Sequence, residues 1–551
     1  MKIKLIFLIF ITTIILIIVK LFYIQILSLN VLNNKNLGLI KLFPDRGIIY
    51  DRNKLPLVLN QTKYKLYVEP KKIKNKEEII EKLDKILNIG EATLEAKIDE
   101  SKIWISIISG VSSTNKKKIL NTKLKGIGFE DESFRFYPEA SLAAHLLGFV
   151  GKNDQGDNVG YFGIEGYYDK NLSGLSGFIK TDKDLFGRYI FMGDQERIEP
   201  ENGRNLVLTI DKTVQGIIKE KLKLGIEKYQ ADKGCIIVAD PKNMEIIGMS
   251  CLPDFDLEKY YEFSEEFFVN DTISSVYEPG STFKPLIVAA ALNEKKIKKD
   301  DIFNEKGPIE IGEYTIRTWN NKYEGKISVT RILEKSSNIG MVYIGKKLGE
   351  KNILSYLNKY GLNTTTGIDL QGETRNILKN NNQWYPIDYT TVTFGQGIAI
   401  TPIQMITAFS SLINGGYLMQ PHIVKSIFYS NNEKEINSKI IRRTISKETS
   451  ETIKKMLLST VENGEYKWVK PKGYKIGGKT GTAQIPIAGK YESSKTIASF
   501  IGFAPYEKPK FIIFVMFKGP KTSIYGSETA APVFFDIAKE LFVYYNIAPE
   551  Q

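Results

Sequence analysis

The sequence predicts a mixed α/β (α+β) protein that carries one N-terminal transmembrane helix. An apolar run opens the chain, over residues 5–27. The second half holds strand-like apolar segments on both sides of a stretch with helical character, an order that gives a sheet covered by helices. The chain has 551 residues, of which 42% are hydrophobic. It is therefore too long for one ordinary domain and apolar enough to bury a core in each of two.

The N-terminal apolar run indicates a membrane anchor rather than a cleaved signal peptide. Lys2 and Lys4 precede residues 5–27, and this segment can cross a bilayer as a helix, with Lys20 reaching toward the outer interface. A cleavable signal peptide needs small residues after its apolar core, whereas the first alanine is Ala92. We expect a single-pass protein of the cell inner (cytoplasmic) membrane, with its N-terminus in the cytoplasm and the rest extracytoplasmic.

We expect the chain to divide into three parts. Residues 1–30 form the cytoplasmic N-terminus and anchor, residues 31–205 a separate extracytoplasmic module, and residues 206–551 a second, larger domain. In the middle part, apolar and charged residues alternate at helical spacing over residues 74–87. The glycine-rich residues 148–166 are expected to be loops.

The larger domain opens with a predicted strand over residues 206–210. Asp211 is expected to cap a helix that reaches about Tyr229. After a hairpin, a long helical region is expected to occupy the middle of the domain. The chain then ends with three apolar segments that we interpret as strands, at residues 496–503, 511–517 and 525–531.

The hairpin contains both cysteines of the chain. Residues 240–243 indicate a turn between two apolar segments. If the turn centres on Asn243, Cys235 and Cys251 are cross-strand partners at a separation that suits a disulfide. One residue of register slip removes that pairing. We favour the alternative, in which both cysteines are small buried hydrophobic residues.

The net charge of +13 leaves two interpretations open. A basic protein can bind nucleic acid, but the lysines are scattered and do not form a stripe with interleaved aromatic residues. The pattern favours a solvated surface that faces anionic lipid or cell-wall polymer, and no nucleic-acid partner is expected.

Three short motifs carry the chemistry. They follow one another along the chain as residues 281–284 (STFK), 336–338 (SSN) and 479–482 (KTGT). Each is weak by itself, since residues 113–116 also match S-x-x-K. The ordered set S-x-x-K, S-x-N and K-T-G is typical of the active site of penicillin-binding proteins and serine β-lactamases. The sequence therefore predicts a serine acyl-enzyme site.

Ser281 is the expected nucleophile and Lys284 its expected base. The two residues lie three apart at the start of a predicted helix, so they share one face of its first turn. A serine hydroxyl needs a base, and the two histidines, His145 and His422, lie in the other module and in a predicted loop. A lysine among apolar residues and near a second cation, such as Lys479, loses its proton more easily. The alternative for this motif alone is a helix cap beside a solvated lysine.

The second and third motifs are expected to complete the site. Ser336 is suited to relay a proton, and Asn338 to bind a substrate amide and hold Lys284. The alternative is a helix-capping cluster. Gly481 in a strand indicates close approach of another backbone, and an extended peptide is expected to add to that strand edge. Three further side chains then supply a cation and two hydroxyls for a substrate carboxylate: Lys479, Thr480 and Thr482. The alternative is an edge strand with a bulge.

These motifs, together with longer segments, resemble class B penicillin-binding proteins. Seven segments outside the second and third motifs carry the resemblance: residues 46–53 (RGIIYDRN), 135–138 (RFYP), 145–148 (HLLG), 163–165 (GIE), 277–281 (YEPGS), 366–370 (TGIDL) and 395–397 (GQG). The resemblance implies a penicillin-binding/serine β-lactamase-like transpeptidase domain over residues 206–551. It also implies an elongated N-terminal pedestal (dimerisation-type) domain over residues 31–205. Two departures are Met244, where the family usually has glycine, and Ser337, which replaces the aspartate of S-D-N.

The resemblance also implies a reaction. Ser281 would attack the D-Ala-D-Ala bond of a stem peptide, with Lys284 as base and Ser336 as proton shuttle. The N–H groups of Ser281 and Thr482 would form the oxyanion hole, and a neighbouring stem peptide's amine would take the acyl group. β-Lactams would be trapped on the serine, and no cofactor or metal is expected. The implied partners are nascent peptidoglycan, the membrane, a polytopic glycosyltransferase and division proteins.

Within the family, two segments resemble the cell-division (septal) branch: residues 497–505 (IASFIGFAP) and 530–534 (AAPVF). The alternatives are an elongation-type class B transpeptidase, more remotely a β-lactamase, and a β-lactam sensor or silent division scaffold. The long module before residue 206 argues against a β-lactamase, and the intact motifs argue against a silent scaffold.

Overall fold

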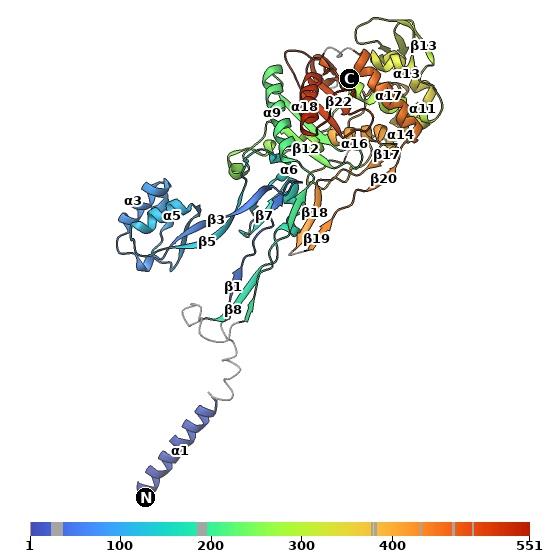
Figure 1. Ribbon diagram of the computed structural model, residues 1–551. Coiled ribbons are helices and arrows are strands. Elements are labelled where there is room, and N and C mark those ends of the chain that lie inside the picture. The colour runs from blue at the N-terminus through green and yellow to red at the C-terminus, as the bar shows by residue number, and fades with distance from the viewer. Residues whose placement is uncertain are drawn as a thin grey trace. The chain divides into compact units, whose positions relative to one another are not determined.

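The structure is a computed structural model (Figure 1). It describes residues 2–23, 37–183, 196–375, 378–379, 383–429, 432–464, 469–487 and 490–550. The chain forms two compact units. One comprises Met1–Arg46 and Ser173–Gly203, and the other comprises Gly47–Leu172 and Arg204–Gln551.

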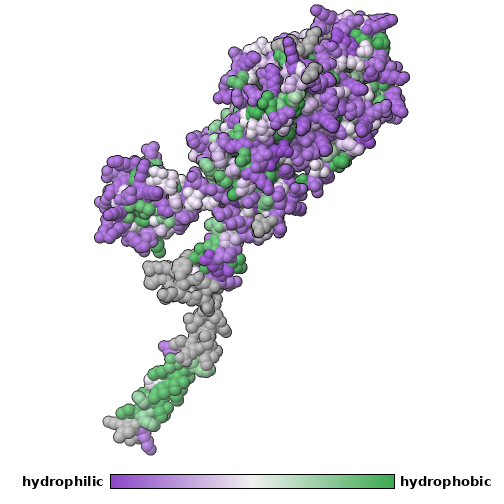
Figure 2. Space-filling view, viewed as in Figure 1, coloured by the Kyte–Doolittle hydropathy of each residue, from purple (hydrophilic) through white to green (hydrophobic). Residues whose placement is uncertain are grey.

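The first unit contains the predicted anchor helix and a small sheet. Helix α1 spans Lys2–Phe22, and from Lys4 onward it is long and apolar enough to cross a membrane. Its apolar side chains are exposed, and Figure 2 shows them as a continuous hydrophobic surface. The predicted extension to residue 27 lies outside the described residues. The sheet has the order β1-β8-β9, with strands Leu37–Leu42, Gly177–Asp182 and Glu196–Ile198.

The second unit begins with strands that carry a small helical lobe. Strand β3 pairs with β2, β4 and β5. The apolar faces of the lobe bury a separate core around Leu66, Leu83 and Ile107. Helix α3 begins two residues after the start of the predicted helix and ends at Leu87, with Asn75 accepting from the Glu78 N–H as its cap. The elements are β2 (Ile49–Tyr50), β3 (Pro56–Val68), η2 (Pro70–Lys72), α3 (Lys76–Leu87), α4 (Glu91–Lys97), β4 (Ile105–Val111), α5 (Ser113–Asn121) and β5 (Ile127–Phe136).

The glycine-rich residues 148–166 do not form the loops that we predicted. They contain a hairpin and a short helix because aromatic side chains there find partners far along the chain. Phe149 stacks on Tyr260 with ring centroids 4.1 Å apart. The local elements are α6 (Ala144–Leu147), β6 (Phe149–Lys152), β7 (Asn158–Tyr161), α7 (Gly163–Tyr167) and α8 (Asp169–Leu172).

Three of the segments that carry the family resemblance meet at one ion pair. Arg135 Nε donates to Glu165 Oε1 at 2.8 Å, and both side chains are buried, at 5% and 0% exposure. The same guanidinium donates to Asn60 Oδ1 (2.7 Å) and to the Gly47 carbonyl (2.6 Å). A planar donor with several N–H groups thus joins residues 46–53, 135–138 and 163–165.

A seven-stranded sheet continues from these strands into the larger domain. Its order is β19-β18-β10-β2-β3-β4, with β5 also on β3, and β10 pairs with β2 in parallel. The added strands are β10 (Asn205–Leu208), β18 (Val424–Tyr429) and β19 (Asn432–Glu435).

The central sheet of the larger domain is antiparallel, with the order β12-β11-β23-β22-β21. Helices α9 and α18 cover one face, where their apolar side chains form a core with Phe500 and Phe517 (Figure 1). Asp211 caps α9 as predicted, accepting from the N–H groups of Thr213 and Val214. The elements are α9 (Lys212–Tyr229), β11 (Lys233–Ala239), β12 (Ile246–Leu252), β21 (Gly477–Ile487), β22 (Lys490–Ala504), β23 (Phe511–Lys518) and α18 (Ala530–Tyr544).

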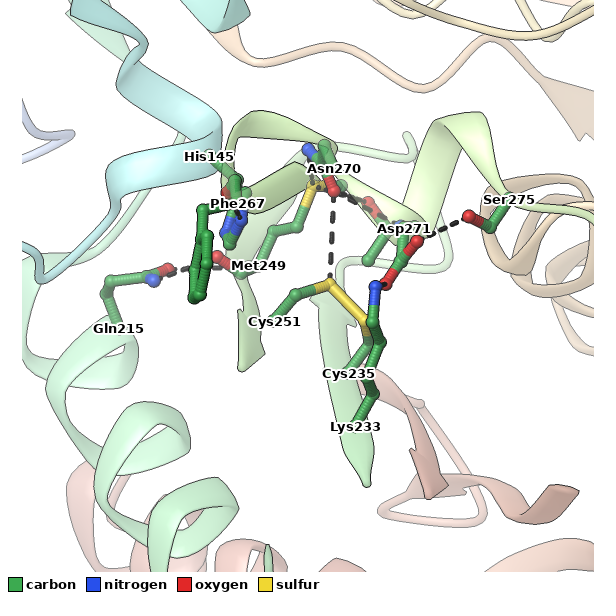
Figure 3. Close-up of a disulfide and its surroundings, with 11 residues drawn as sticks. His145, Gln215, Lys233, Cys235, Met249, Cys251, Phe267, Asn270, Asp271 and Ser275 are labelled. Carbon is green, nitrogen blue, oxygen red and sulfur yellow. Dashed lines mark hydrogen bonds and ion pairs between the residues drawn. A yellow bond between two sulfur atoms is a disulfide. The ribbon is translucent and has the colours of Figure 1, made fainter. Parts of the chain in front are cut away.

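The two cysteines are paired, so the favoured alternative of two buried thiols is wrong. Cys235 of β11 lies opposite Cys251 of β12, the register that a turn centred on Asn243 requires, and the two form a disulfide (Figure 3). Met244 has φ +57 and is fully buried, so the position where the family usually has glycine does adopt the left-handed region.

The other face of the central sheet carries a larger helical layer. The predicted long helical region is interrupted, because residues 302–328 form two hairpins. The elements are η3 (Leu257–Glu262), η4 (Glu265–Phe268), α10 (Asp271–Ser274), η5 (Gly280–Phe283), α11 (Lys284–Asn293), β13 (Ile302–Glu305), β14 (Ile309–Ile311), β15 (Tyr314–Ile316), β16 (Gly325–Ser328), α12 (Val329–Glu334), α13 (Asn338–Leu348), α14 (Glu350–Lys359), α15 (Pro386–Thr391), η7 (Val392–Phe394), α16 (Pro402–Ile413), β17 (Tyr417–Met419), β20 (Ile440–Arg443) and α17 (Lys447–Asn463).

The predicted strand over residues 525–531 is also wrong. Tyr525 accepts from the N–H groups of Glu528 and Thr529, which closes a turn, and α18 begins at Ala530. The turn brings Gly526 against β21 and β22, where a Cβ would lie 2.3 Å from the carbonyl oxygen of Gly481. This contact is tertiary, so the local apolar pattern did not reveal it.

Candidate active site

The first motif begins at a glycine that approaches two other segments. Gly280 has φ +54, and its N–H donates to the Gly395 carbonyl at 3.0 Å. A Cβ at this position would lie 3.1 Å from the carbonyl oxygen of Thr482, so glycine suits both the conformation and the space. Ser281 lies in the η5 turn that follows, and α11 begins at Lys284. The serine and the lysine are therefore about one helical turn apart.

Tyr277 anchors the approach to this turn. Its backbone exchanges two hydrogen bonds with Ile400, at 2.9 and 3.0 Å, and its ring lies 6.0 Å from that of Phe514. Burial raises the pKa of Tyr277 well above its ordinary value. The phenol is therefore neutral near pH 7 and is not a candidate base.

Lys284 joins the first motif to the second. The lysine is fully buried, and its Nζ donates to the Ser336 carbonyl (2.6 Å), Ser336 Oγ (3.1 Å) and Asn338 Oδ1 (2.8 Å). A buried ammonium group is costly unless its N–H groups find acceptors. Two of these three oxygens can only accept a hydrogen bond, whereas the Ser336 hydroxyl can either accept or donate.

Ser336 lies in a sharp turn between two helices. Helix α12 ends at Glu334 and α13 begins at Asn338, with Ser337 as its cap. Ser336 has φ +58, a left-handed conformation that costs a non-glycine residue about 1 kcal/mol or more. The surrounding contacts offset this cost, and they direct the carbonyl and hydroxyl of Ser336 toward Lys284.

The third motif lies on β21, the edge strand of the central sheet. The strand approaches the η5 turn closely at Gly481. A Cβ there would lie 2.5 Å from Ser499 Oγ, 2.9 Å from Thr282 Cγ2 and 3.0 Å from the Pro279 carbonyl oxygen. A side chain would therefore push the strand away from Ser281.

The two threonine hydroxyls of this motif accept hydrogen bonds from groups in the fold. Thr482 Oγ1 accepts from the Gly526 N–H at 3.0 Å, and Thr480 Oγ1 accepts from Lys479 Nζ at 3.3 Å. Each hydroxyl also carries one proton that it can donate. Both threonines line the pocket, so they can donate to a carboxylate bound there. Lys479 is buried, with 1% of its surface exposed.

The three motifs surround one cavity of about 640 Å³. Ser281, Ser336, Asn338, Thr480 and Thr482 line it, whereas Lys284, Lys479 and Gly481 lie behind its wall. The lining residues are Gly280, Ser281, Thr315, Arg317, Trp319, Ser336, Asn338, Phe394, Gln396, Thr480, Thr482, Gln484, Thr496, Ile524, Tyr525 and Ser527. None of these described lining residues is acidic, so the cavity suits an anionic substrate.

Several lining residues were missed by the sequence analysis. Arg317 and Trp319 follow strand β15, and Trp319 meets Tyr525 edge to face with ring centroids 5.6 Å apart. No spacing rule links these residues to the motifs, and Tyr525 was assigned to a strand. The connection is a tertiary contact, in which Asn338 Nδ2 donates to the Arg317 carbonyl at 3.1 Å.

This geometry suits an active-serine acyl-transfer site. A serine lines the cavity at a helix start, a buried lysine lies one turn later, and a second serine and an asparagine bind that lysine. An open strand edge with two hydroxyl donors borders the same cavity. Such an arrangement can activate a hydroxyl nucleophile and align an extended peptide that ends in a carboxylate.

Comparisons with known proteins agree with this assignment. Residues 234–539 match the family model "Penicillin binding protein transpeptidase domain", and residues 41–208 match "Penicillin-binding Protein dimerisation domain". The chain is 35% identical over 518 residues to stage V sporulation protein D of Bacillus subtilis, covering 92% of this chain and 79% of that protein. It is 28% identical over 515 residues to peptidoglycan D,D-transpeptidase FtsI of Escherichia coli, covering 92% and 84%.

Solved structures show the same fold. The crystal structure of penicillin binding protein 2X from Streptococcus thermophilus matches with a TM-score of 0.76 at 23% identity, over 93% of this chain and 83% of that one. The chain belongs to the class B penicillin-binding protein transpeptidases, as its sequence motifs indicated.

Proposed function

We propose that this protein is a membrane-anchored serine D,D-transpeptidase that cross-links peptidoglycan stem peptides through an acyl-enzyme on Ser281. One observation carries the proposal: Lys284 Nζ is held by Ser336 and Asn338 behind a cavity that Ser281 lines. A buried lysine one turn from a serine is suited to take the hydroxyl proton as the serine attacks.

The hydrogen bonds of Lys284 support a proton relay through Ser336. The ammonium form has three N–H groups for three oxygens, whereas the neutral amine has two N–H groups and a lone pair. The Ser336 carbonyl and Asn338 Oδ1 can retain those two N–H groups. The Ser336 hydroxyl, 3.1 Å from Nζ, can then reverse its role and donate. The Ser336 hydroxyl can pass a proton from Lys284 to the leaving D-alanine amine. In the second half of the reaction it can pass a proton from the acceptor amine back to Lys284.

The strand edge supports the assignment of substrate contacts. A stem peptide that extends along β21 would form main-chain hydrogen bonds, and its terminal carboxylate would accept from Thr480 and Thr482 near Lys479. The N–H groups of Ser281 and Thr482 would bind the oxyanion, and Gly481 would keep the strand close to the serine. A β-lactam carries a similar carboxylate and would leave a stable acyl group on the serine.

The N-terminal helix supports a single-pass anchor. We assign residues 1–30 to the cytoplasmic N-terminus and anchor, residues 31–205 to a pedestal domain, and residues 206–551 to the catalytic domain outside the membrane. The anchor and pedestal are then the surfaces offered to a polytopic glycosyltransferase and to division proteins.

Residues 497–505 and the relatives named FtsI support a role at the division septum. A second candidate is a sporulation role, favoured by the 35% identity to stage V sporulation protein D. An elongation-type transpeptidase and a β-lactam sensor or division scaffold are the remaining alternatives. Depletion separates these roles: filamentation indicates division, rounding indicates elongation, and normal growth with failed sporulation indicates the second candidate.

Fluorescent penicillin tests the chemistry. The detergent-solubilised full-length protein should form a stable covalent adduct that Ser281→Ala abolishes. The absence of a Ser281-dependent adduct would contradict the proposal. Rapid loss of the adduct would indicate a β-lactamase. A stable adduct on a protein that transfers no peptide would indicate a sensor.

A further inference from the structure

A buried carboxylate contacts both chain neighbours of Ser336. Glu305 ends strand β13, and its side chain has no exposed surface. Its Oε2 accepts from Lys335 Nζ at 2.9 Å, and its Oε1 accepts from the Ser337 hydroxyl. Ser336 lies between these two partners in the chain, so a single carboxylate holds the turn from both sides.

The carboxylate is satisfied by groups of the fold. Besides Lys335 and Ser337, it accepts from the backbone N–H of Glu324 at 3.1 Å. The Lys335 side chain is itself only 8% exposed. A buried carboxylate is stable only when it is paired and hydrogen-bonded in this way. A glutamine at position 305 has one acceptor oxygen, so it cannot accept from both neighbours through separate oxygens.

The turn that Glu305 holds is the one that binds Lys284. The Ser337 hydroxyl donates to Glu305 and also accepts from the Gly340 N–H at 2.9 Å, which caps α13. Helix α13 begins with Asn338, one acceptor of the Lys284 ammonium. Ser336, the other, keeps its left-handed conformation between the two residues that Glu305 binds. Such strained residues persist where the surroundings over-determine them.

We propose that Glu305 is a positioning residue, which fixes the Ser336 turn and through it the Lys284 ammonium beside Ser281. The proposal rests on the proposed acyl-enzyme function. A carboxylate suits this role because its two oxygens accept separately from Lys335 and Ser337, and its charge neutralises the buried ammonium of Lys335. The S-D-N form of the second motif has aspartate in the middle, whereas this chain has Ser337 there, and its hydroxyl binds a carboxylate that comes from β13.

The first test compares two glutamine variants of the full-length protein. Glu305→Gln should slow the acylation rate constant for fluorescent penicillin by about 10²-fold, the usual cost of misplacing a catalytic group, with little change in the binding constant. Glu324→Gln is the matched control, because Glu324 also pairs with Lys335 (3.5 Å) and with Arg331 but its side chain does not reach Ser337. Its rate constant should stay within about threefold of wild type.

The second test restores the carboxylate from the other side. In Glu305→Gln/Ser337→Asp the negative charge moves to the helix cap, where aspartate is also a good capping residue. The acylation rate constant of this double variant should be at least about tenfold higher than that of Glu305→Gln. Glu305→Gln/Lys335→Met removes both charges, so that no buried ion is left unpaired if Glu305→Gln alone folds poorly. It should label completely but slowly.

The labelled fraction is read separately from the rate constant. A wild-type rate constant in Glu305→Gln or in Glu305→Gln/Lys335→Met would overturn the proposal. Equal slowing in Glu324→Gln, or no recovery on moving the carboxylate, would also overturn it. A reduced labelled fraction with an unchanged rate constant would mean that Glu305 only stabilises the fold, and the proposal would be wrong. If the wild-type protein forms no adduct at Ser281, the proposed function fails instead.

Discussion

At the scale of single residues, the site depends on how Lys284 is held. Its Nζ donates to three oxygens of residues 336–338, the arrangement that an ammonium group prefers. The lysine can act as a base only after it has lost a proton. A side chain at position 284 that cannot lose a proton should therefore not activate Ser281, even if it fills the same space as the lysine.

Lys284→Arg tests this requirement. A guanidinium keeps the positive charge and can donate to the same oxygens, but it does not lose its proton in proteins. We expect the acylation rate constant to fall by about 10²- to 10⁴-fold, the usual contribution of a general base. Stopped-flow or gel-based labelling with fluorescent penicillin measures this rate constant. A fall of less than tenfold would exclude Lys284 as the base.

Gly481→Ala tests the close approach of β21 to the serine. The new methyl group would meet Ser499, Thr282 and Pro279 within about 3 Å, so the strand has to move away from η5. Overpacking of this kind costs about 1–3 kcal/mol of unfolding free energy, and we expect an acylation loss of about 10²-fold. The control is Gly216→Ala, since a Cβ at Gly216 meets nothing within 4 Å. That variant should label like wild type, and equal labelling of Gly481→Ala would contradict the argument.

At the scale of elements, the short helix α6 carries a buried histidine that links stability to pH. His145 Nε2 lies 2.9 Å from the Phe267 carbonyl, which can only accept, so this nitrogen carries the proton (Figure 3). Burial lowers the pKa of His145, and the hydrogen bond to Phe267 only partly offsets this effect. The folded protein therefore resists protonation that the unfolded chain accepts.

The sign of the pH dependence follows. Above the ordinary histidine pKa of about 6.5, both the folded and the unfolded protein hold a neutral His145, and the free energy of unfolding is not reduced by this residue. As the pH falls toward the lower pKa of the folded state, the unfolded chain binds a proton that the folded protein does not, and the free energy of unfolding decreases. His145→Gln keeps an N–H donor but does not titrate. Between pH 7.5 and 5.5 the urea midpoint of wild type should fall more than that of His145→Gln. Parallel curves for the two proteins would show that His145 contributes no pH dependence.

Elements with strong local signals could be predicted from the sequence. Asp211 and the apolar spacing after it defined α9, and the turn at residues 240–243 defined the hairpin. The disulfide could not be predicted with the same certainty, because the register of two strands is not fixed by one hairpin alone. Strand β23 also pairs along β11 and helps to fix that register. The hairpins at residues 302–328 and the turn after Tyr525 depend on contacts with distant segments, so no local pattern distinguished them.

The motif residues of the candidate site could be predicted from the sequence, but the residues that pack around them could not. Each motif lies within a single turn or strand, so its residues keep a fixed spacing in the sequence. Glu305, Arg317 and Trp319 reach the site from the hairpins between β13 and β16, and their positions follow from packing rather than spacing. Glu305 lies 32 residues before Ser337 in the chain, and nothing in its local sequence indicates the contact.

At the scale of the whole molecule, the seven-stranded sheet joins two regions that the sequence analysis treated as separate. Strand β10 pairs with β2 in parallel, and Arg52 forms an ion pair with Glu245 at 2.8 Å. Residues 47–172 and the larger domain form one compact unit. The strands around β3 are therefore joined to the larger domain by a shared sheet rather than by a linker.

Membrane attachment should depend on α1 alone. In the full-length protein the apolar surface of this helix is exposed and needs lipid or detergent. We expect the full-length protein to resist carbonate extraction and to dissolve in detergent, whereas a chain without residues 1–30 should remain in the soluble fraction. The truncated protein should still label with fluorescent penicillin at a rate within about twofold of full length, since α1 supplies no group to the cavity. Carbonate-resistant pelleting of the truncated chain would show a second membrane contact.

The most direct measurement of the central claim is peptide transfer by the purified full-length protein. The protein is incubated with glycan strands that carry pentapeptide stems and with a labelled D-amino acid as acceptor. We predict that D-alanine release equals incorporation of the labelled acceptor plus cross-link formation, and that Ser281→Ala abolishes all three. Release of D-alanine without transfer, or transfer that persists in Ser281→Ala, would contradict a Ser281 transpeptidase.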